Sequence, residues 1–196
     1  MDLTPEQRRS SIYPLLTTHV QRFFVGHVIT EHRPDAVRVY EHLPHFRILQ
    51  VSPGPKTPFW TYISLGAWEM LAPDLTTFEF LLIAPEQHDD HMRLIAMLAY
   101  YHTLDHGRLG IGHTLPIGHP WLPHATCDHL LICHPYPFSA TFEHCVAEDF
   151  TIHLLWALPI TAAENAYKRT HGLERLEEQF DQATIAYWEP QRASVV

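Results

Sequence analysis

The chain has few basic residues. Its 196 residues include 13 Lys and Arg against 22 Asp and Glu, giving a formal net charge of −9 at pH 7. Binding to phosphates requires a basic surface, so this balance argues against nucleic acid as a partner and favours a basic protein. No apolar run is long enough to span a bilayer, which argues against a membrane partner. The polar first residues, 1–9, lack the apolar segment of a secretion signal.

Cysteine is also scarce. The chain has 3 cysteines, Cys127, Cys133 and Cys145, and no CxxC pair. This pattern is typical of reduced thiols and predicts a cytoplasmic protein. No cysteine follows the small-residue turn of a nucleophile elbow and there is no GxSxG motif, so we predict no catalytic residue.

The overall composition predicts a folded protein, with 46% hydrophobic and 18% charged residues. Thr4-Pro5-Glu6-Gln7 predicts a capped helix reaching about residue 24, which Pro14 should kink or split. We expect residues 1–30 to form a helical segment packed on a domain of residues 31–190.

Hydrophobic patterns predict strands and helices that alternate along the domain. Thr77–Ala84 and Phe150–Leu158 are apolar on both faces, which is typical of central strands covered by helices. Further strands are predicted at Val37–Leu43, Phe46–Ser52, Phe59–Trp68 and Cys127–His134. Helices are predicted at 88–102 and after the capping box Thr161-Ala-Ala-Glu164. The fold class is therefore α/β (α+β): a single domain with a mixed sheet flanked by helices.

The segment Gly110–His124 is rich in glycine and proline and is predicted to be an irregular loop. Loops of this length in compact domains are usually functional. Trp121 lies between two prolines and is hard to place in a core, so we expect an exposed contact residue there. Trp60 should share one strand face with Tyr62 and Trp68, as an interface anchor or as core.

The 17 histidines invite a metal-enzyme interpretation. Those from the loop onward, at 113, 119, 124, 129 and 134, span a loop and then a strand, so the five rings cannot share one face. There is no HExxH motif and no finger spacing. We therefore predict no metal site and no cofactor, and a metal-assisted hydrolase using loop histidines stays as the alternative.

Several segments, taken in order, resemble one known family. They are Trp60–Trp68, Phe78–Pro85, Leu98–His102, Gly110-Ile-Gly-His-Thr-Leu-Pro116, Phe150–Glu164 and Gly172–Phe180. Their order and spacing resemble the suppressor of fused (SUFU) family, in its short, single-domain bacterial form. The resemblance implies a mixed α/β domain that binds other proteins, partly by adding a peptide strand. For the short bacterial members it implies an immunity protein.

These observations lead to one functional hypothesis. The protein binds a toxin domain of a polymorphic or contact-dependent toxin system and blocks it by steric occlusion. The predicted contact residues are Gly112, His113, Pro116, His119, Trp121 and Trp60. Self-association into a homodimer is a further possibility.

Overall fold

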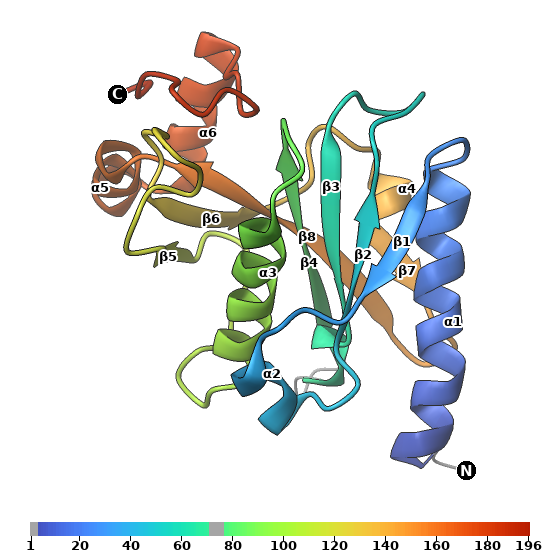
Figure 1. Ribbon diagram of the computed structural model, residues 1–196. Coiled ribbons are helices and arrows are strands. Elements are labelled where there is room, and N and C mark those ends of the chain that lie inside the picture. The colour runs from blue at the N-terminus through green and yellow to red at the C-terminus, as the bar shows by residue number, and fades with distance from the viewer. Residues whose placement is uncertain (1–3, 71–76) are drawn as a thin grey trace.

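One mixed sheet forms the centre of the protein. The computed structural model describes residues 4–70 and 77–196, and within them eight strands follow the order β1-β2-β3-β4-β8-β6-β5, with β7 also paired to β8 (Figure 1). The strands are β1 Ile29–His32, β2 Arg47–Val51, β3 Trp60–Leu65, β4 Thr77–Ala84, β5 Thr114–Pro116, β6 His129–Cys133, β7 His144–Val146 and β8 Thr151–Ile160. β4 and β8 are parallel, and the other pairs are antiparallel. The predicted single α/β domain with a mixed sheet is confirmed.

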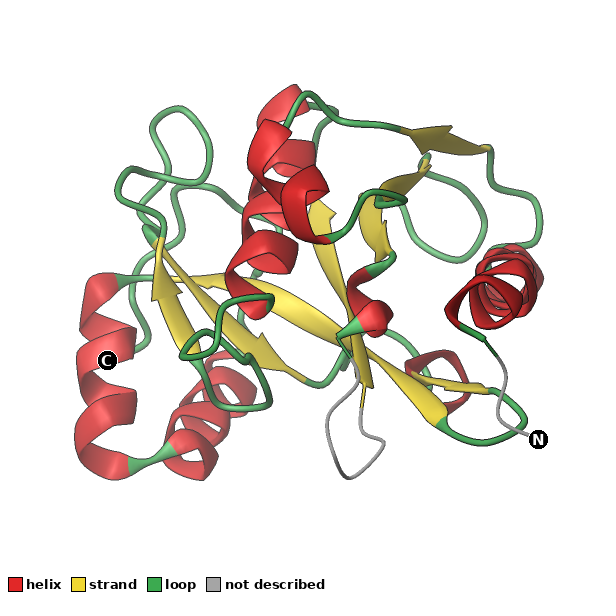
Figure 2. Ribbon diagram, turned by 90° about the horizontal axis from the view of Figure 1, so that it is seen from below, coloured by secondary structure: helices red, strands yellow, loops and turns green. Residues whose placement is uncertain are grey.

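Helices cover both faces of this sheet (Figures 1 and 2). They are α1 Pro5–Phe23, α2 Val37–His42, α3 Asp89–His102, α4 Ala140–Glu143, α5 Ala162–His171 and α6 Leu173–Ala183, with the 3-10 helix η1 Ala67–Glu69. Side chains of β4 alternate between two hydrophobic clusters. Phe80 and Leu82 face α3, whereas Leu81 and Ile83 face α1 and α6. This alternation explains why β4 reads as apolar on both faces.

β8 pairs with three strands. β4 lies along one of its edges. The other edge is shared: β6 pairs with residues 156–160 of β8, and β7 pairs with residues 151–153. The end of β6 and the start of β7 therefore meet beside the middle of β8.

α1 begins as predicted. Thr4 and Gln7 form a reciprocal capping box. The helix then runs through Pro14 without a break, so of the two predicted effects, a kink or a split, the split does not occur. Pro14 lies on the exposed side of the helix, where water can satisfy the carbonyl that its missing amide leaves free.

The predicted strand at Val37–Leu43 is also wrong, because this segment forms α2. Its buried residues, Val39 and Leu43, are four positions apart and so lie on one helical face. Tyr40 fixes the start of the helix through a bond from its hydroxyl to the Pro34 carbonyl, at 2.7 Å. The β-branched valines suggested a strand, but packing against α3 and the cluster on that side of the sheet selects a helix.

Candidate protein-binding site

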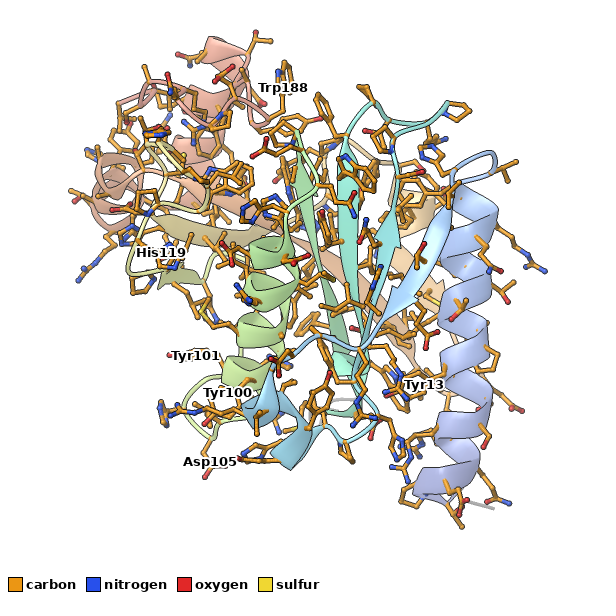
Figure 3. The ribbon with its side chains drawn as sticks, in the orientation of Figure 1. Tyr13, Tyr100, Tyr101, Asp105, His119 and Trp188 are labelled. Atoms are coloured by element: carbon orange, nitrogen blue, oxygen red, sulfur yellow. The ribbon has the colours of Figure 1, made fainter. Side chains whose placement is uncertain are left out.

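The predicted loop Gly110–His124 carries the edge strand of the sheet. β5 lies inside this segment and pairs on one side with β6. Within the part of the chain that the structure describes, no strand pairs with its other side. His113, Pro116 and His119 are all exposed around β5. Figure 3 shows His119 on the β5 side of the molecule, across the sheet from Tyr13 on α1.

Gly112 opens this edge with a β-bulge. Its amide donates to the Ile132 carbonyl at 2.8 Å, and the Ile132 amide donates to the His113 carbonyl at 2.9 Å. Gly112 and His113 therefore both lie opposite Ile132, and Gly112 has φ +85°, a conformation that favours glycine. The Gly112 carbonyl accepts a hydrogen bond from the Lys168 ammonium of α5. Gly112 thus shapes the edge and ties it to α5.

The ladder leaves a short stretch of β5 backbone free. The Ile117 amide donates to the Asp128 carbonyl at 2.8 Å, and the His113 carbonyl accepts from the Ile132 amide. The backbone hydrogen-bonding groups that point toward β6 are therefore those of alternate residues, at 113, 115 and 117. Because backbone groups alternate in direction along an antiparallel strand, the amide and carbonyl of Thr114 and the carbonyl of Pro116 point away from β6. These outward groups are what a partner strand would bind.

Hydrogen bonds fix the tautomers of the two exposed histidines. The Gly110 amide donates to His113 Nδ1 at 3.0 Å, so Nδ1 accepts and the proton of the neutral ring sits on Nε2. His119 Nδ1 lies 2.7 Å from the Pro120 carbonyl, which can only accept, so Nδ1 carries the proton and the neutral ring has its lone pair on Nε2. The edge therefore offers one imidazole donor and one acceptor.

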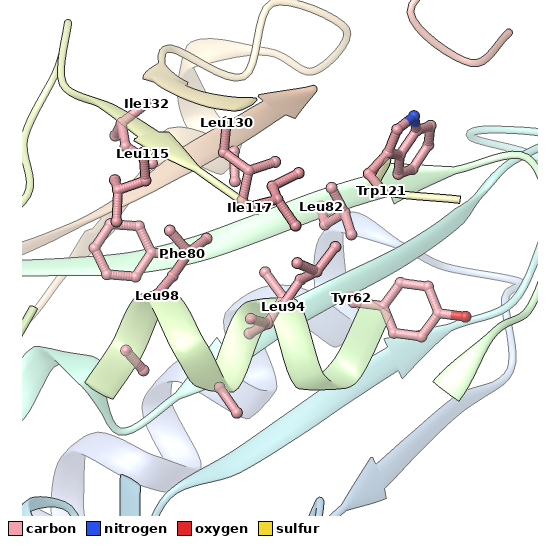
Figure 4. Close-up of a cluster of buried hydrophobic side chains, with 14 of the residues drawn as sticks. Tyr62, Phe80, Leu82, Leu94, Leu98, Leu115, Ile117, Trp121, Leu130 and Ile132 are labelled. Atoms are coloured by element: carbon pink, nitrogen blue, oxygen red, sulfur yellow. The ribbon is translucent and has the colours of Figure 1, made fainter. Parts of the chain in front are cut away.

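Trp121 is not the exposed contact residue that its neighbouring prolines suggested. Its side chain is 2% exposed. Figure 4 shows it inside the buried cluster with Tyr62 and Leu82. The chain turns back here, with the Trp121 amide bonded to the Cys127 carbonyl at 3.0 Å, and this turn directs the indole ring inward. Trp121 instead packs in the buried cluster and holds the loop against the core.

Trp60 lies apart from the β5 edge. It begins β3, where it pairs with Ala84 and is half-buried against the α3-side cluster. Four strand spacings separate β3 from β5, on the order of 19 Å. The predicted grouping of Trp60 with Trp68 is wrong, because Gly66, at φ +128°, ends the strand and places Trp68 in the opposite cluster.

Sequence reasoning missed two hollows on the surface. One, of about 590 Å³, lies between α6, the middle of β8 and residues 136–137, and its lining includes Trp156, Phe180 and Glu177. The other, of about 690 Å³, lies between α1 and the β1–β3 side of the sheet and is lined mostly by polar residues. Both are formed by residues distant in sequence, so no local pattern marks them.

In the part of the chain that the structure describes, the loop histidines do not converge on a metal-binding cluster. In residues 4–70 and 77–196, the only group of three or more metal-binding side chains is Glu143, His144 and His153, and no loop histidine belongs to it. All three cysteines are buried, and burial raises the pKa of their thiols. These thiols are therefore poor nucleophiles at neutral pH.

Comparison with known proteins identifies the family. A model of the family described as "Suppressor of fused protein (SUFU)" matches residues 42–193. The chain belongs to the SUFU family. A crystal structure described as a SUFU homolog from Neisseria gonorrhoeae FA 1090 is 33% identical, with a TM-score of 0.83 over 94% of this chain and 96% of that one. The SUFU resemblance and the SUFU-like fold predicted from the sequence are therefore confirmed.

Two more distant structures share the fold. One, the Sufu-Fu complex, is 12% identical with a TM-score of 0.65, over 93% of this chain and 91% of that chain. Drosophila Suppressor of Fused is also 12% identical, with a TM-score of 0.56, and the match covers 85% of this chain but 52% of the Drosophila chain. A search of curated proteins finds no match. In the described residues, no helix has the length and apolar character needed to cross a membrane.

Proposed function

We propose that this protein binds a second protein at the outer edge of β5, and that the partner is a toxin domain which it neutralises by steric occlusion. The observation that carries the proposal is the open edge itself, where outward backbone groups lie between the exposed side chains of His113, Pro116 and His119. An unpaired strand edge is a template for adding an extended segment of another chain.

The edge is held rigidly, which favours binding. Ile117, Trp121 and Leu122 are buried beneath it, and the bulge at Gly112 fixes its start. A surface already held in its binding conformation loses little entropy when a partner docks. This support makes a peptide-binding role more plausible for β5 than for an unsupported loop.

Membership of the SUFU family supports binding over catalysis. The distant structure described as the Sufu-Fu complex has a fold like that of this chain. At 12% identity it supplies the fold alone, so the nature of the partner rests on the resemblance to short bacterial members. The net charge of −9 is complementary to a basic toxin, such as a nuclease, and would accelerate its association.

The proposal is tested with toxin-like proteins encoded beside this gene. Each is mixed with the purified protein, and affinity is measured by calorimetry. Thr114→Pro removes the outward amide of β5, as proline does at natural sheet edges, and should weaken binding at least about tenfold. Glu31→Pro makes the same change on β1, the opposite edge of the sheet, and should leave affinity unchanged.

A second variant guards against misfolding. His113→Ala with His119→Ala keeps the backbone of β5 and removes both exposed imidazoles, and it should also weaken binding. Circular dichroism checks that each variant folds. Failure of every neighbouring toxin to bind, together with unchanged survival of cells that lack the gene beside toxin-producing siblings, would refute the toxin-binding role. Equal losses in the Thr114 and Glu31 variants would place the interface elsewhere.

A further inference from the structure

A second cluster of chemically reactive side chains lies where β6 and β7 meet beside β8. His144 is the first residue of β7 and pairs directly with His153 of β8. Directly opposed residues of an antiparallel pair project their side chains on the same face. Glu143 ends α4 immediately before His144, and His134 follows the end of β6. Four elements, the end of β6, α4, β7 and β8, therefore bring these four side chains to one place.

The distances suit a metal ion. One ligand atom from each of Glu143, His144 and His153 lies within 4.8 Å of the others. His144 Nε2 is 3.8 Å from Glu143 Oε1. Ligand bonds of about 2.0–2.2 Å place the donors of a tetrahedral zinc site roughly 3.3–3.5 Å apart. Small side-chain rotations would bring the three donors onto one ion.

The hydrogen bonds around the cluster leave the ligand atoms of His144 and Glu143 oriented for metal binding. His144 Nδ1 lies 2.9 Å from the Ala140 carbonyl. A carbonyl only accepts, so Nδ1 carries the proton and the Nε2 lone pair is free toward Glu143. His134 Nδ1 donates to Glu143 Oε1 at 2.8 Å and holds the carboxylate in place. Metal sites commonly show this arrangement, in which a second hydrogen bond orients each ligand.

The charge balance also favours a cation. The Glu143 side chain is only 10% exposed, and in the described part of the chain its ion-pair contacts are to histidines, with no Lys or Arg. A buried carboxylate is normally paired with a positive charge or a metal.

We propose that Glu143, His144 and His153 form a binding site for a divalent transition-metal ion, with Zn²⁺ as the best fit. Two imidazoles and one carboxylate are a common zinc ligand set, and the fourth position would hold water. His134 is a positioning residue that orients Glu143. The site is independent of the β5 edge and of the proposed toxin partner.

This set differs from the histidines that the sequence brought forward. Glu143 and His144 are adjacent in sequence, but His153 lies nine positions later on another strand. The β7–β8 pairing brings them together, and no spacing rule for zinc sites describes that arrangement. The sequence-based prediction of no metal site did not consider Glu143, His144 and His153 together.

The test uses full-length protein without a histidine tag, stripped of metal by a chelator. Zn²⁺ affinity and stoichiometry are measured by competition with a chromophoric chelator, and Co²⁺ is added to record the absorption bands of a tetrahedral site. The unmodified protein should bind one Zn²⁺ per chain. His144→Ala or His153→Ala should weaken binding at least about 100-fold, and His134→Gln about 10- to 100-fold. His45→Ala, which removes an exposed histidine elsewhere, should have no effect.

Thermal unfolding provides a second readout. Zn²⁺ should raise the melting temperature of the unmodified protein and of His45→Ala, but not that of His144→Ala or His153→Ala. His144 is exposed, so its variant should fold normally in the absence of metal. The proposal is overturned if the unmodified protein binds no Zn²⁺ at 100 µM, or if the His144 and His153 variants bind it as tightly as the His45 variant does.

Discussion

Glu79 shows how one buried carboxylate can organise a turn. It lies on β4 and is fully buried. It accepts hydrogen bonds from the Ser64 hydroxyl and from the backbone amides of Gly66, at 2.7 Å, and of Ala67 and Trp68. These amides belong to the turn that ends β3 and begins η1. Glu79 thereby satisfies the free amides at the start of η1 from a neighbouring strand.

The position of Glu79 leads to a prediction about pH. Burial raises its pKa from 4.5 to about 7, although the hydrogen bonds from Ser64 and the turn partly oppose this. The folded state then holds a proton that the unfolded state releases, so stability falls as the pH rises from about 4.5 to 7. Relative to Glu79→Gln, the unmodified protein should lose on the order of 3 kcal/mol of unfolding free energy over this range.

Urea unfolding at a series of pH values measures this difference. Gln has the same shape as Glu and does not titrate, so subtracting the two curves isolates Glu79 from the histidines. A flat difference would show that the Glu79 carboxyl titrates alike in both states and would contradict the prediction.

At the residue scale, the sequence identified exposed polar residues better than buried ones. His113, Pro116 and His119 were expected at the surface and are exposed there. Trp121 was expected there too, because flanking prolines suggested a stiff, protruding loop. Its burial depends on the bond to Cys127 and on space beside Tyr62, which are tertiary features with no local signature. The role of Glu79 was likewise invisible, because its partners lie 11 to 15 positions away.

At the scale of elements, the start of α5 combines a predictable and an unpredictable feature. The capping box of Thr161 and Glu164 is present as predicted. In addition, Glu164 is completely buried and forms a two-pronged ion pair with Arg192, at 2.5 and 2.7 Å. Arg192 also donates to the Pro159 carbonyl, at 3.1 Å. The contacts of Arg192 thus hold the C-terminal segment against the end of β8.

Arg192→Ala should destabilise the protein by about 3–5 kcal/mol, because it leaves the buried Glu164 carboxylate without a compensating positive charge. Chemical denaturation measures the loss. Arg175→Ala is the matched control: it breaks the exposed pair with Glu178 and should cost less than about 1 kcal/mol. If the two variants lose equal stability, the buried pair contributes no more than a surface one.

Elements with strong and long patterns were predicted best. β4 was placed at its exact bounds and α3 within one residue, because both bury extended apolar surfaces. Short elements were not: α2 was predicted as a strand, while β1, β5, α4 and β7 were not predicted. In elements of three to six residues, packing against neighbouring elements outweighs intrinsic preference. The proposed metal cluster depends on two of these short elements, α4 and β7, which is why the sequence did not reveal it.

At the scale of the whole molecule, charge depends on which histidines can titrate. A histidine side chain in water gains charge as the pH falls below about 6.5. His91 and His102 do not follow, because burial lowers the pKa of each to about 4. With 17 histidines in all, the net charge of −9 at pH 7 still shrinks sharply under mildly acidic conditions.

This titration predicts a pH-dependent association rate. A basic partner bound at the β5 edge is steered by the whole acidic surface, so its association rate should fall at least about tenfold between pH 7.5 and pH 5.5 at low salt. Stopped-flow fluorescence measures the rate with the toxin captured in the binding assay. At 0.5 M salt the charges are screened, and the rate should be low at both pH values. A rate that changes with pH equally at low and high salt would instead indicate a specific histidine contact, and His113→Ala and His119→Ala would then identify which ring is responsible.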